Sequence, residues 1–323
     1  MKAEALPNRQ SIRKRGWDYT AAGWYFVTIN THRARPWFGV IVNGKMILNE
    51  MGRLAEEEWR KSASIRPGIV LDECVIMPDH MHGLVRLPEG RQGPQGRDAS
   101  RPYACGAASG SLGALVAGYK AAVSRQARRR GLAGADDEVW HRNYWDVIVS
   151  DAQALANIRR YIRNNPQNAM SALQASEPKF VGNRALWDRP KIGFLASRGP
   201  ASPHGRLDLK ANEAILSGFL SPMERALFKS GLAKGKPMIW VKPWGLNEGL
   251  DHPATRRAMD DGRLLVVSPF DAAAEAPSAR RAAWCNQYVL AHGDRIVVGH
   301  LTPGGMLACL LSEAKPDMEI IYL

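Results

Sequence analysis

The chain has few cysteines and no long apolar run, and both absences narrow its class. Neither a disulfide framework nor a zinc knuckle is expected, because the four cysteines lie far apart without a CxxC pair: Cys74, Cys105, Cys285 and Cys309. No run of roughly 18 apolar residues occurs, and the basic first residues lack the apolar stretch of a signal peptide. We therefore expect an intracellular protein with no membrane partner.

Acidic residues are too few to balance the bases in the first part of the chain. Residues 1–200 contain 30 Lys and Arg against 18 Asp and Glu, whereas residues 201–323 contain 14 against 13. This asymmetry predicts that the first part binds a polyanion and that the second part has another task. A chain of 323 residues also exceeds the usual size of one domain, so two domains are expected.

The first half alternates strand-like and helix-like segments. We expect strands, rich in aromatic and β-branched residues, at 24–30, 39–48 with a hairpin turn at Asn43-Gly44, 69–77, 81–87 and 139–149. Helical spacing of apolar residues predicts helices at 49–62, 111–130 and 151–165, the last ending before Pro166. This order predicts an α+β domain in which helices cover an antiparallel sheet.

The pattern changes to α/β after about residue 191. Short apolar runs, typical of strands buried in a parallel sheet, occur at 238–241, 264–268 and 296–299. We accordingly predict two domains, residues 1–192 and residues 193–323, of which the second is smaller and Rossmann-like.

Two histidines stand at strand spacing in His80-Met81-His82. Residues i and i+2 of a strand project from the same face, so both imidazoles can approach one cation while Met81 points towards the core. Two such side chains make half of a metal site. The alternative is that both histidines are structural.

Tyr161 and Asn165 are one helical turn apart and share a helix face. A phenol and an amide oxygen on one face could reach the same metal-bound phosphate. The alternative is a core tyrosine followed by an asparagine that caps the helix. Cationic side chains around these motifs are candidate phosphate contacts or simply a solvated basic face: Lys120, Arg125, Arg128, Arg142 and Arg163.

Together these motifs resemble the HUH-type transposases, above all the REP-associated tyrosine transposases. The matching stretches cover about residues 16–170 and are CVIMPDHMHGLVRL, SLGALVAGYKAAVSRQARRR, VWHRNYWDVIV and RRYIRNNP, in that order. The resemblance implies an HUH domain in which His80, His82 and Asn165 hold Mg²⁺ or Mn²⁺ and Tyr161 is the nucleophile.

The same resemblance implies the activity. Such an enzyme cleaves and rejoins single-stranded or hairpin DNA through a covalent phosphotyrosine, in the bacterial cytoplasm and associated with the nucleoid. It leaves the choice between monomer and homodimer open. The alternative is a catalytically silent, transposase-derived DNA-binding or regulatory protein.

The second half resembles the Rossmann-like domain of DNA-processing protein A. The residues that carry this resemblance are 221–225, 262–270, 280–281 and 304–306. It implies a nucleotide or single-strand DNA contact at Gly304 and Gly305, since glycines after a buried strand let a phosphate approach backbone N–H groups. A plain structural turn is the alternative.

Overall fold

A computed structural model describes residue 14 and residues 17–89, 110–173, 177–199, 207–246, 250–270 and 278–323. The chain divides into two units, the first comprising residues 1–37 and 51–164 and the second residues 38–50 and 165–323. By these bounds the second unit is the longer one, whereas the sequence predicts a smaller C-terminal domain.

The first unit is an antiparallel sheet with helices, as predicted. Its elements are β1 (Gly23–Asn30), η1 (His32–Ala34), α1 (Glu50–Ser64), β4 (Val70–Met77), β5 (His80–Leu87), α2 (Leu112–Arg129), β6 (Trp145–Ile148) and the first part of α3 (Ala152–Leu173). The sheet order is β4-β5-β1-β6, and every neighbouring pair is antiparallel. The two central strands, β5 and β1, therefore carry the His80-Met81-His82 motif and its partner residues.

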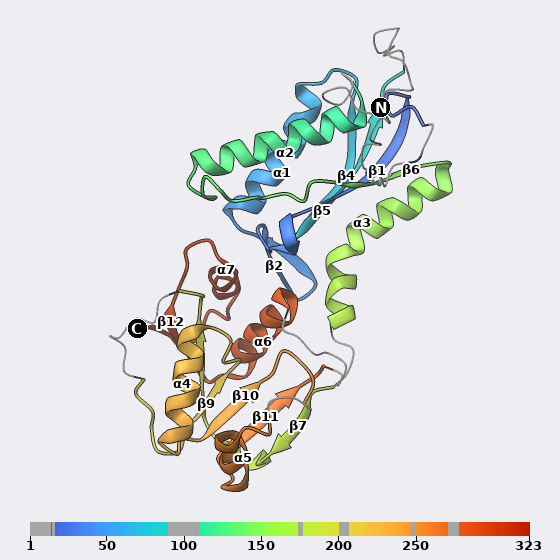
Figure 1. The fold of residues 1–323 in the computed structure, drawn as a ribbon. Helices are drawn as coiled ribbons and strands as arrows, with labels where there is room; N and C mark the ends of the chain where they lie inside the picture. Colours follow the sequence, from blue (N-terminus) through green and yellow to red (C-terminus); the bar gives the residue numbers. More distant parts are fainter. Residues whose placement is uncertain are drawn as a thin grey trace, which may run out of the picture. The chain divides into compact units, whose positions relative to one another are not determined.

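The two faces of this sheet are covered by different helices. Figure 1 shows α1 and α2 on one side of the strands and α3 on the other. Trp59 of α1 packs against Tyr119 of α2, with ring centroids 5.3 Å apart. A Cβ at Gly83 would lie 2.5 Å from the Trp59 ring, so only glycine fits at this position of β5. Met81 and Gly83 thus face α1 and α2, and the alternation of a strand turns His80 and His82 towards α3.

Helix α3 continues through Pro166, so the prediction that it ends at Asn165 was wrong. Proline in a helix interior lacks an N–H to donate and costs about 3 kcal/mol. Tertiary packing overrides that local cost here, because Asn165, Pro166 and Met170 are all buried.

Strand β6 is shorter than the predicted strand at 139–149. Trp140 forms only an isolated bridge with Thr31, and the ladder with β1 covers Trp145 to Ile148. The segment between them is held by a side chain. The Lys120 ammonium donates hydrogen bonds to the carbonyl oxygens of residues 141, 142 and 143. A side chain therefore replaces the backbone partner that pattern reasoning assumed.

The second unit is built on a seven-stranded sheet. Its elements are β2 (Gly39–Val42), β3 (Lys45–Leu48), β7 (Lys179–Gly182), η2 (Arg184–Leu186), β8 (Lys191–Ala196), β9 (Ala214–Ser217), α4 (Pro222–Ala233), β10 (Met238–Val241), α5 (Pro253–Asp260), β11 (Leu264–Ser268), α6 (Ala279–His292), β12 (Arg295–His300), α7 (Met306–Ser312) and β13 (Ile320–Tyr322). The order is β13-β12-β8-β9-β10-β11-β7, and all strands are parallel except β7. Strands β9 to β11 are added on one side of β8, and β12 and β13 on the other side. The α/β character expected of this half is therefore present.

Each face of the parallel sheet has its own core. One cluster joins Leu195, Leu216 and Ile239 to residues of α6 and α7, including Trp284 and Leu307. The other joins the alternating strand residues, such as Phe194 and Ile215, to α4 and α5. Burial on both faces explains why these strands read as continuous apolar runs.

The β2–β3 hairpin belongs to the second unit although it comes from the first fifty residues. Its turn uses Asn43 and Gly44, both with positive φ, as the sequence predicts. Val40 packs in a buried cluster with Leu310, and the Gln287 side-chain amide donates to the Ile41 carbonyl oxygen over 2.8 Å. The predicted boundary between residues 192 and 193 differs from this arrangement, since β7 is also hydrogen-bonded into the second sheet through β11.

Two further features concern cysteines and membranes. Cys74, Cys285 and Cys309 are free thiols. Among the described residues, no helix has both the length and the apolar character needed to cross a bilayer.

Candidate functional site

The two histidines of the motif lie side by side at one end of β5. In the ladder with β1, His82 is paired with Thr28 and His80 with Asn30. Their imidazole ring centroids are 4.7 Å apart, and His82 is buried. The predicted convergence of the two rings on one sheet face is therefore present.

Each imidazole is oriented by a hydrogen bond at Nδ1. His82 Nδ1 lies 2.8 Å from the Thr28 hydroxyl, and His80 Nδ1 lies 2.7 Å from a carboxylate oxygen of Asp79. A donating Nδ1–H at both positions leaves the Nε2 lone pair available on each ring, which is the arrangement that metal-binding histidines use. Thr28 was not singled out in the sequence, because nothing in a lone threonine indicates its cross-strand partner.

Burial keeps His82 neutral. Desolvation, with a smaller contribution from neighbouring His80, lowers the pKa of His82 to about 3. An imidazole with so low a pKa binds a cation without first losing a proton, but it is too weak a base to accept the proton of a phenol readily. The geometry thus suits His82 for binding a cation better than for general-base catalysis.

Tyr161 meets this pair from α3. Its hydroxyl oxygen lies 3.5 Å from His82 Nε2, and its ring contacts the rings of His82 and Phe26, with centroids 5.3 Å and 6.0 Å away. The side chain remains 47% exposed. A phenol with one side against the histidines and the other in solvent is accessible to a substrate phosphate.

Two ion pairs hold α3 on this face of the sheet. Arg159 Nε donates to Asp72 over 2.9 Å, and Arg163 Nε donates to Glu73 over 2.7 Å. Both acids belong to β4, so the pairs fix the helix beside the histidines on either side of Tyr161. Sequence reasoning missed Asp72, Glu73 and Arg159, and it proposed Arg163 as a phosphate contact without seeing its carboxylate partner.

The donor set fits a divalent cation in part. Within the described residues, no group of three or more His, Cys, Asp and Glu side chains is arranged to hold a metal ion. A cation at His80 and His82 would therefore take its other ligands from an amide, water or substrate phosphate, all of them oxygen donors that Mg²⁺ and Mn²⁺ accept. Asn165 is buried one turn after Tyr161 on α3 and is grouped with the second unit. Its role as a ligand stays a prediction.

The predicted cationic contacts fall into two groups. Lys120 and Arg128 are used inside the fold, since Arg128 donates to the carbonyl oxygens of Ala135 and Asp137, and burial lowers the pKa of Lys120 to about 8. Arg125 and Arg142 are exposed, and their side chains make no ion pair or hydrogen bond within the described part of the chain. These two arginines are the better placed for a phosphate.

The two groups should respond differently to neutral substitution. We expect Lys120→Met to lower the free energy of unfolding by about 1 to 3 kcal/mol, because it leaves backbone carbonyls without their charged donor. Arg125→Met, on the same helix, should leave the unfolding midpoint unchanged and weaken DNA binding, with a shallower dependence on salt. Urea unfolding and a salt series of DNA-binding isotherms measure the two effects. Unchanged stability of Lys120→Met would contradict the structural role.

The glycines predicted to contact a nucleotide lie in a tight turn before α7. Gly304 has φ +66°, and the Gly305 N–H donates to the Thr302 carbonyl oxygen over 3.1 Å. The Gly304 carbonyl oxygen in turn accepts from the Asn49 side chain at 3.0 Å. These contacts are those of a structural turn, and a ligand at Gly304 and Gly305 stays a prediction.

The family of the chain is shown by its similarity to a bacterial protein. An uncharacterized protein of Haemophilus influenzae is 34% identical over 166 residues, which are 50% of this chain and 89% of that protein. The chain belongs to the family of this protein. No protein-family profile matches the chain.

Solved structures similar to parts of the chain include three DNA-related proteins. A REP-associated tyrosine transposase bound to a REP hairpin is 19% identical, with a TM-score of 0.33 over 49% of this chain and 74% of that one. DNA processing protein A from Streptococcus pneumoniae is 17% identical, with a TM-score of 0.34 over 54% and 71%. DNA processing protein A from Helicobacter pylori, solved for its single-stranded DNA binding mode, is 18% identical, with a TM-score of 0.29 over 38% and 59%. All three scores lie below 0.5, so the function proposed below rests on the chain's own site.

Proposed function

We propose that the chain is a metal-dependent, single-strand DNA transposase and endonuclease that cleaves and rejoins DNA beside hairpin-forming repeats. The observation that carries this proposal is the Tyr161 hydroxyl at 3.5 Å from His82 Nε2, next to a second imidazole. A half-exposed phenol beside two imidazoles is the combination that a tyrosine nucleophile and a cation site require.

The proposed reaction is a transesterification. The Tyr161 oxygen attacks phosphorus, and the bond from phosphorus to the 3′ oxygen breaks. The phenol proton passes to water, and the 3′ oxygen takes a proton from water and leaves as a hydroxyl. Attack by a 3′ hydroxyl on the phosphotyrosine reverses these steps and rejoins DNA without ATP, because the number of phosphoester bonds is conserved. A divalent cation, Mg²⁺ or Mn²⁺, supplies Lewis-acid stabilisation of the phosphate charge when it is bound.

The chain's own residues position the reacting groups. Thr28 and Asp79 fix the two imidazoles through Nδ1, and the two ion pairs between α3 and β4 fix the phenol. Such preorganisation lowers the entropic cost of bringing the nucleophile into line with the phosphate. Arg125 and Arg142 supply exposed positive charge for the DNA backbone.

Single-stranded DNA is the expected substrate form. A phenol held on a helix above a sheet must reach one phosphate in line, and a paired strand would obstruct that approach. Unpaired bases beside a hairpin can also stack on exposed aromatic side chains, a contribution of about 1 to 3 kcal/mol per base. Trp145 on β6 is such a side chain, at 57% exposure, whereas the neighbouring Tyr144 is buried.

The test compares matched substrates. We expect cleavage of a labelled strand flanking a hairpin in the presence of Mn²⁺, and little or no cleavage of the same sequence in a perfect duplex. Both substrates should bind less tightly as salt rises, because phosphate neutralisation releases counterions from either form. Equal cleavage rates on the two substrates would contradict the proposed mechanism, and binding without any cleavage would favour the catalytically silent alternative.

A further inference from the structure

We propose that a cavity lined by Trp24 and Arg86 holds one unpaired nucleobase of the DNA strand that is cut at Tyr161. The inference rests on the proposed function, because it assigns part of the substrate to a second place on the same sheet face. Its occupant is defined by chemistry, as a flat aromatic base that carries a phosphate on its sugar.

The strand register puts the cavity in line with the histidines. Trp24 is paired with Arg86 across β1 and β5, just as Thr28 is paired with His82 four residues further along the same strand. Even residue spacing along a strand means that Trp24 shares the face of Thr28, and Arg86 the face of His82. Four residues of strand span roughly 13 Å, about the rise of four stacked nucleotides at 3.4 Å each. A short single strand can therefore reach both places.

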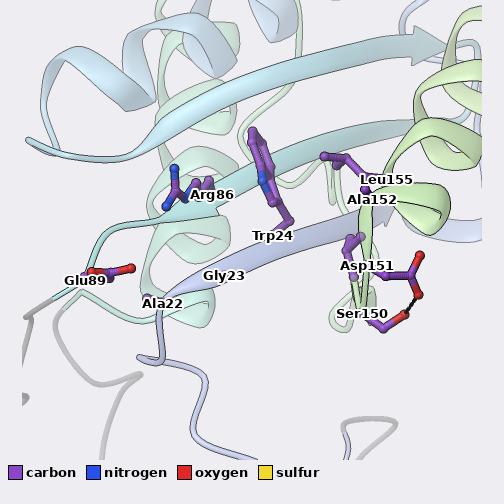
Figure 2. A pocket seen from close by; sticks show the side chains of 10 residues that line it. Ala22, Gly23, Trp24, Arg86, Glu89, Ser150, Asp151, Ala152 and Leu155 are labelled. Atoms are coloured by element: carbon purple, nitrogen blue, oxygen red, sulfur yellow. Dashed lines mark hydrogen bonds between the residues drawn. The ribbon is translucent and has the colours of Figure 1, made fainter.

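The cavity has the size and lining of a base site. Its volume is about 400 Å³, within the range of pockets for small ligands. Figure 2 shows the Trp24 ring between the Arg86 side chain and the first residues of α3, with Gly23 next to it on the strand. Gly23 has φ +150°, and a Cβ built there would meet nothing within 4 Å. A bare stretch of backbone beside an indole leaves room for a base to lie close to the strand.

The charged groups that line the cavity indicate where the base and the phosphate of the nucleotide would lie. Arg86 is exposed and makes no ion pair or hydrogen bond within the described residues, so its guanidinium is available to a phosphate or to a base edge. Asp151 is already used, since it caps α3 by accepting from the Ala154 N–H at 2.8 Å and from the Ser150 hydroxyl at 2.6 Å. Glu89 is a second carboxylate in the lining. Two carboxylates do not attract a further anion, so the cavity favours a neutral base, with the phosphate at Arg86.

The Trp24 ring is held in place for stacking. Arg159, which is paired with Asp72, lies with its guanidinium carbon 5.8 Å from the centroid of the Trp24 ring. A ring fixed in this way loses little conformational entropy when a base stacks on it. The same arginine belongs to the ion pairs that position Tyr161, which ties the cavity to the cleavage site through one side chain.

The experiment uses the full chain carrying Tyr161→Phe, so that DNA binds without being cut. A hairpin DNA with an unpaired arm carries a single 2-aminopurine, moved one position at a time along the arm. We expect strong fluorescence quenching at one position and much weaker quenching elsewhere. Adding Trp24→Leu should remove the quenching at that position and weaken binding of the arm by roughly 5- to 100-fold, which corresponds to 1 to 3 kcal/mol of stacking at 1.4 kcal/mol per tenfold.

Three controls accompany this variant. Trp24→Phe should retain most of the quenching, and Tyr322→Leu, at an exposed aromatic side chain of the second unit, should leave the identified position unaffected. With an abasic site at that position, Trp24→Leu should no longer change the affinity for the arm. If Trp24→Leu lowers the unfolding midpoint, Arg86→Gln on the protein surface takes its place and should weaken binding of the same position.

The outcomes separate this inference from the proposed function. Uniform quenching along the arm, or a quenched position that survives Trp24→Leu, would overturn the base site even if wild-type protein cleaves the DNA. A Trp24-dependent position together with absent cleavage would support the base site and contradict the enzyme. Quenching of a free 2-aminopurine nucleotide without any quenched position in the arm would assign the cavity to a free nucleotide and overturn the inference.

Discussion

Tyr161→Phe should reduce DNA cleavage by at least about a thousandfold, or about 4 kcal/mol of transition-state stabilisation, and should abolish the covalent protein–DNA adduct. The substitution removes the only atom of this side chain that can attack phosphorus. Denaturing gels that resolve the adduct and the cleaved strand measure both effects.

The same substitution should leave folding and DNA binding nearly unchanged. The hydroxyl touches only His82 at 3.5 Å among the contacts described, and phenylalanine retains the ring contacts with Phe26 and His82. Tyr322→Phe is the matched control, since Tyr322 is also an exposed tyrosine and lies in the second unit. An adduct that persists in Tyr161→Phe would move the nucleophile to another residue.

Replacing the histidines should have the second-largest effect. We expect His80→Ala to lower Mn²⁺-supported cleavage by a hundredfold or more, about 3 kcal/mol, because one of two imidazole ligands is lost. His82→Gln should do the same while keeping a polar partner for the Thr28 hydroxyl, so that no buried group is left without a hydrogen bond.

Metal binding itself gives an independent measurement. Titration calorimetry with Mn²⁺ should detect a site in the wild-type protein that both variants weaken. His32→Ala is the control, because His32 pairs with Glu138 at 3.1 Å outside the motif. Cleavage that is undiminished in the double variant, with a chelator present, would defeat the metal assignment.

The sheet and the helices were predictable wherever local pattern and tertiary packing agree. Alternation along β1 buries Tyr25, Val27 and Ile29 on one face, and Ser111 caps α2 by accepting from the Ala114 N–H. The Asn43-Gly44 turn has the positive φ angles that favour these residue types. In each case a short stretch of sequence contains the physical cause of its own conformation.

Other features depend on partners far away in the chain. Pro166 stays inside α3 because its neighbours are buried, and β6 begins late because Lys120 occupies the preceding carbonyl oxygens. The hairpin at residues 39–48 packs with Leu310, more than 260 residues later. No window of sequence around these residues contains such partners. The predictions there therefore followed local preference alone, with a helix that ends before Pro166 and an unbroken strand at 139–149.

The candidate site was half predictable for the same reason. Strand and helix periodicity placed His80 beside His82 and Tyr161 beside Asn165, but neither period relates the strand to the helix. That relation depends on the ion pairs of Arg159 with Asp72 and of Arg163 with Glu73. From the sequence, only the resemblance of the ordered motifs to a known family predicted that the histidine strand and the tyrosine helix form one site.

The most direct test of the account maps the covalent bond. Wild-type protein is incubated with Mn²⁺ and a hairpin DNA that has an unpaired arm, denatured and digested with protease and nuclease, and the peptide that retains a nucleotide is identified by mass spectrometry. The account predicts a phosphodiester-linked nucleotide on Tyr161, formed with the hairpin substrate and absent with the matched duplex. A nucleotide on any other residue, or no nucleotide-bearing peptide despite cleavage of the DNA, would contradict it.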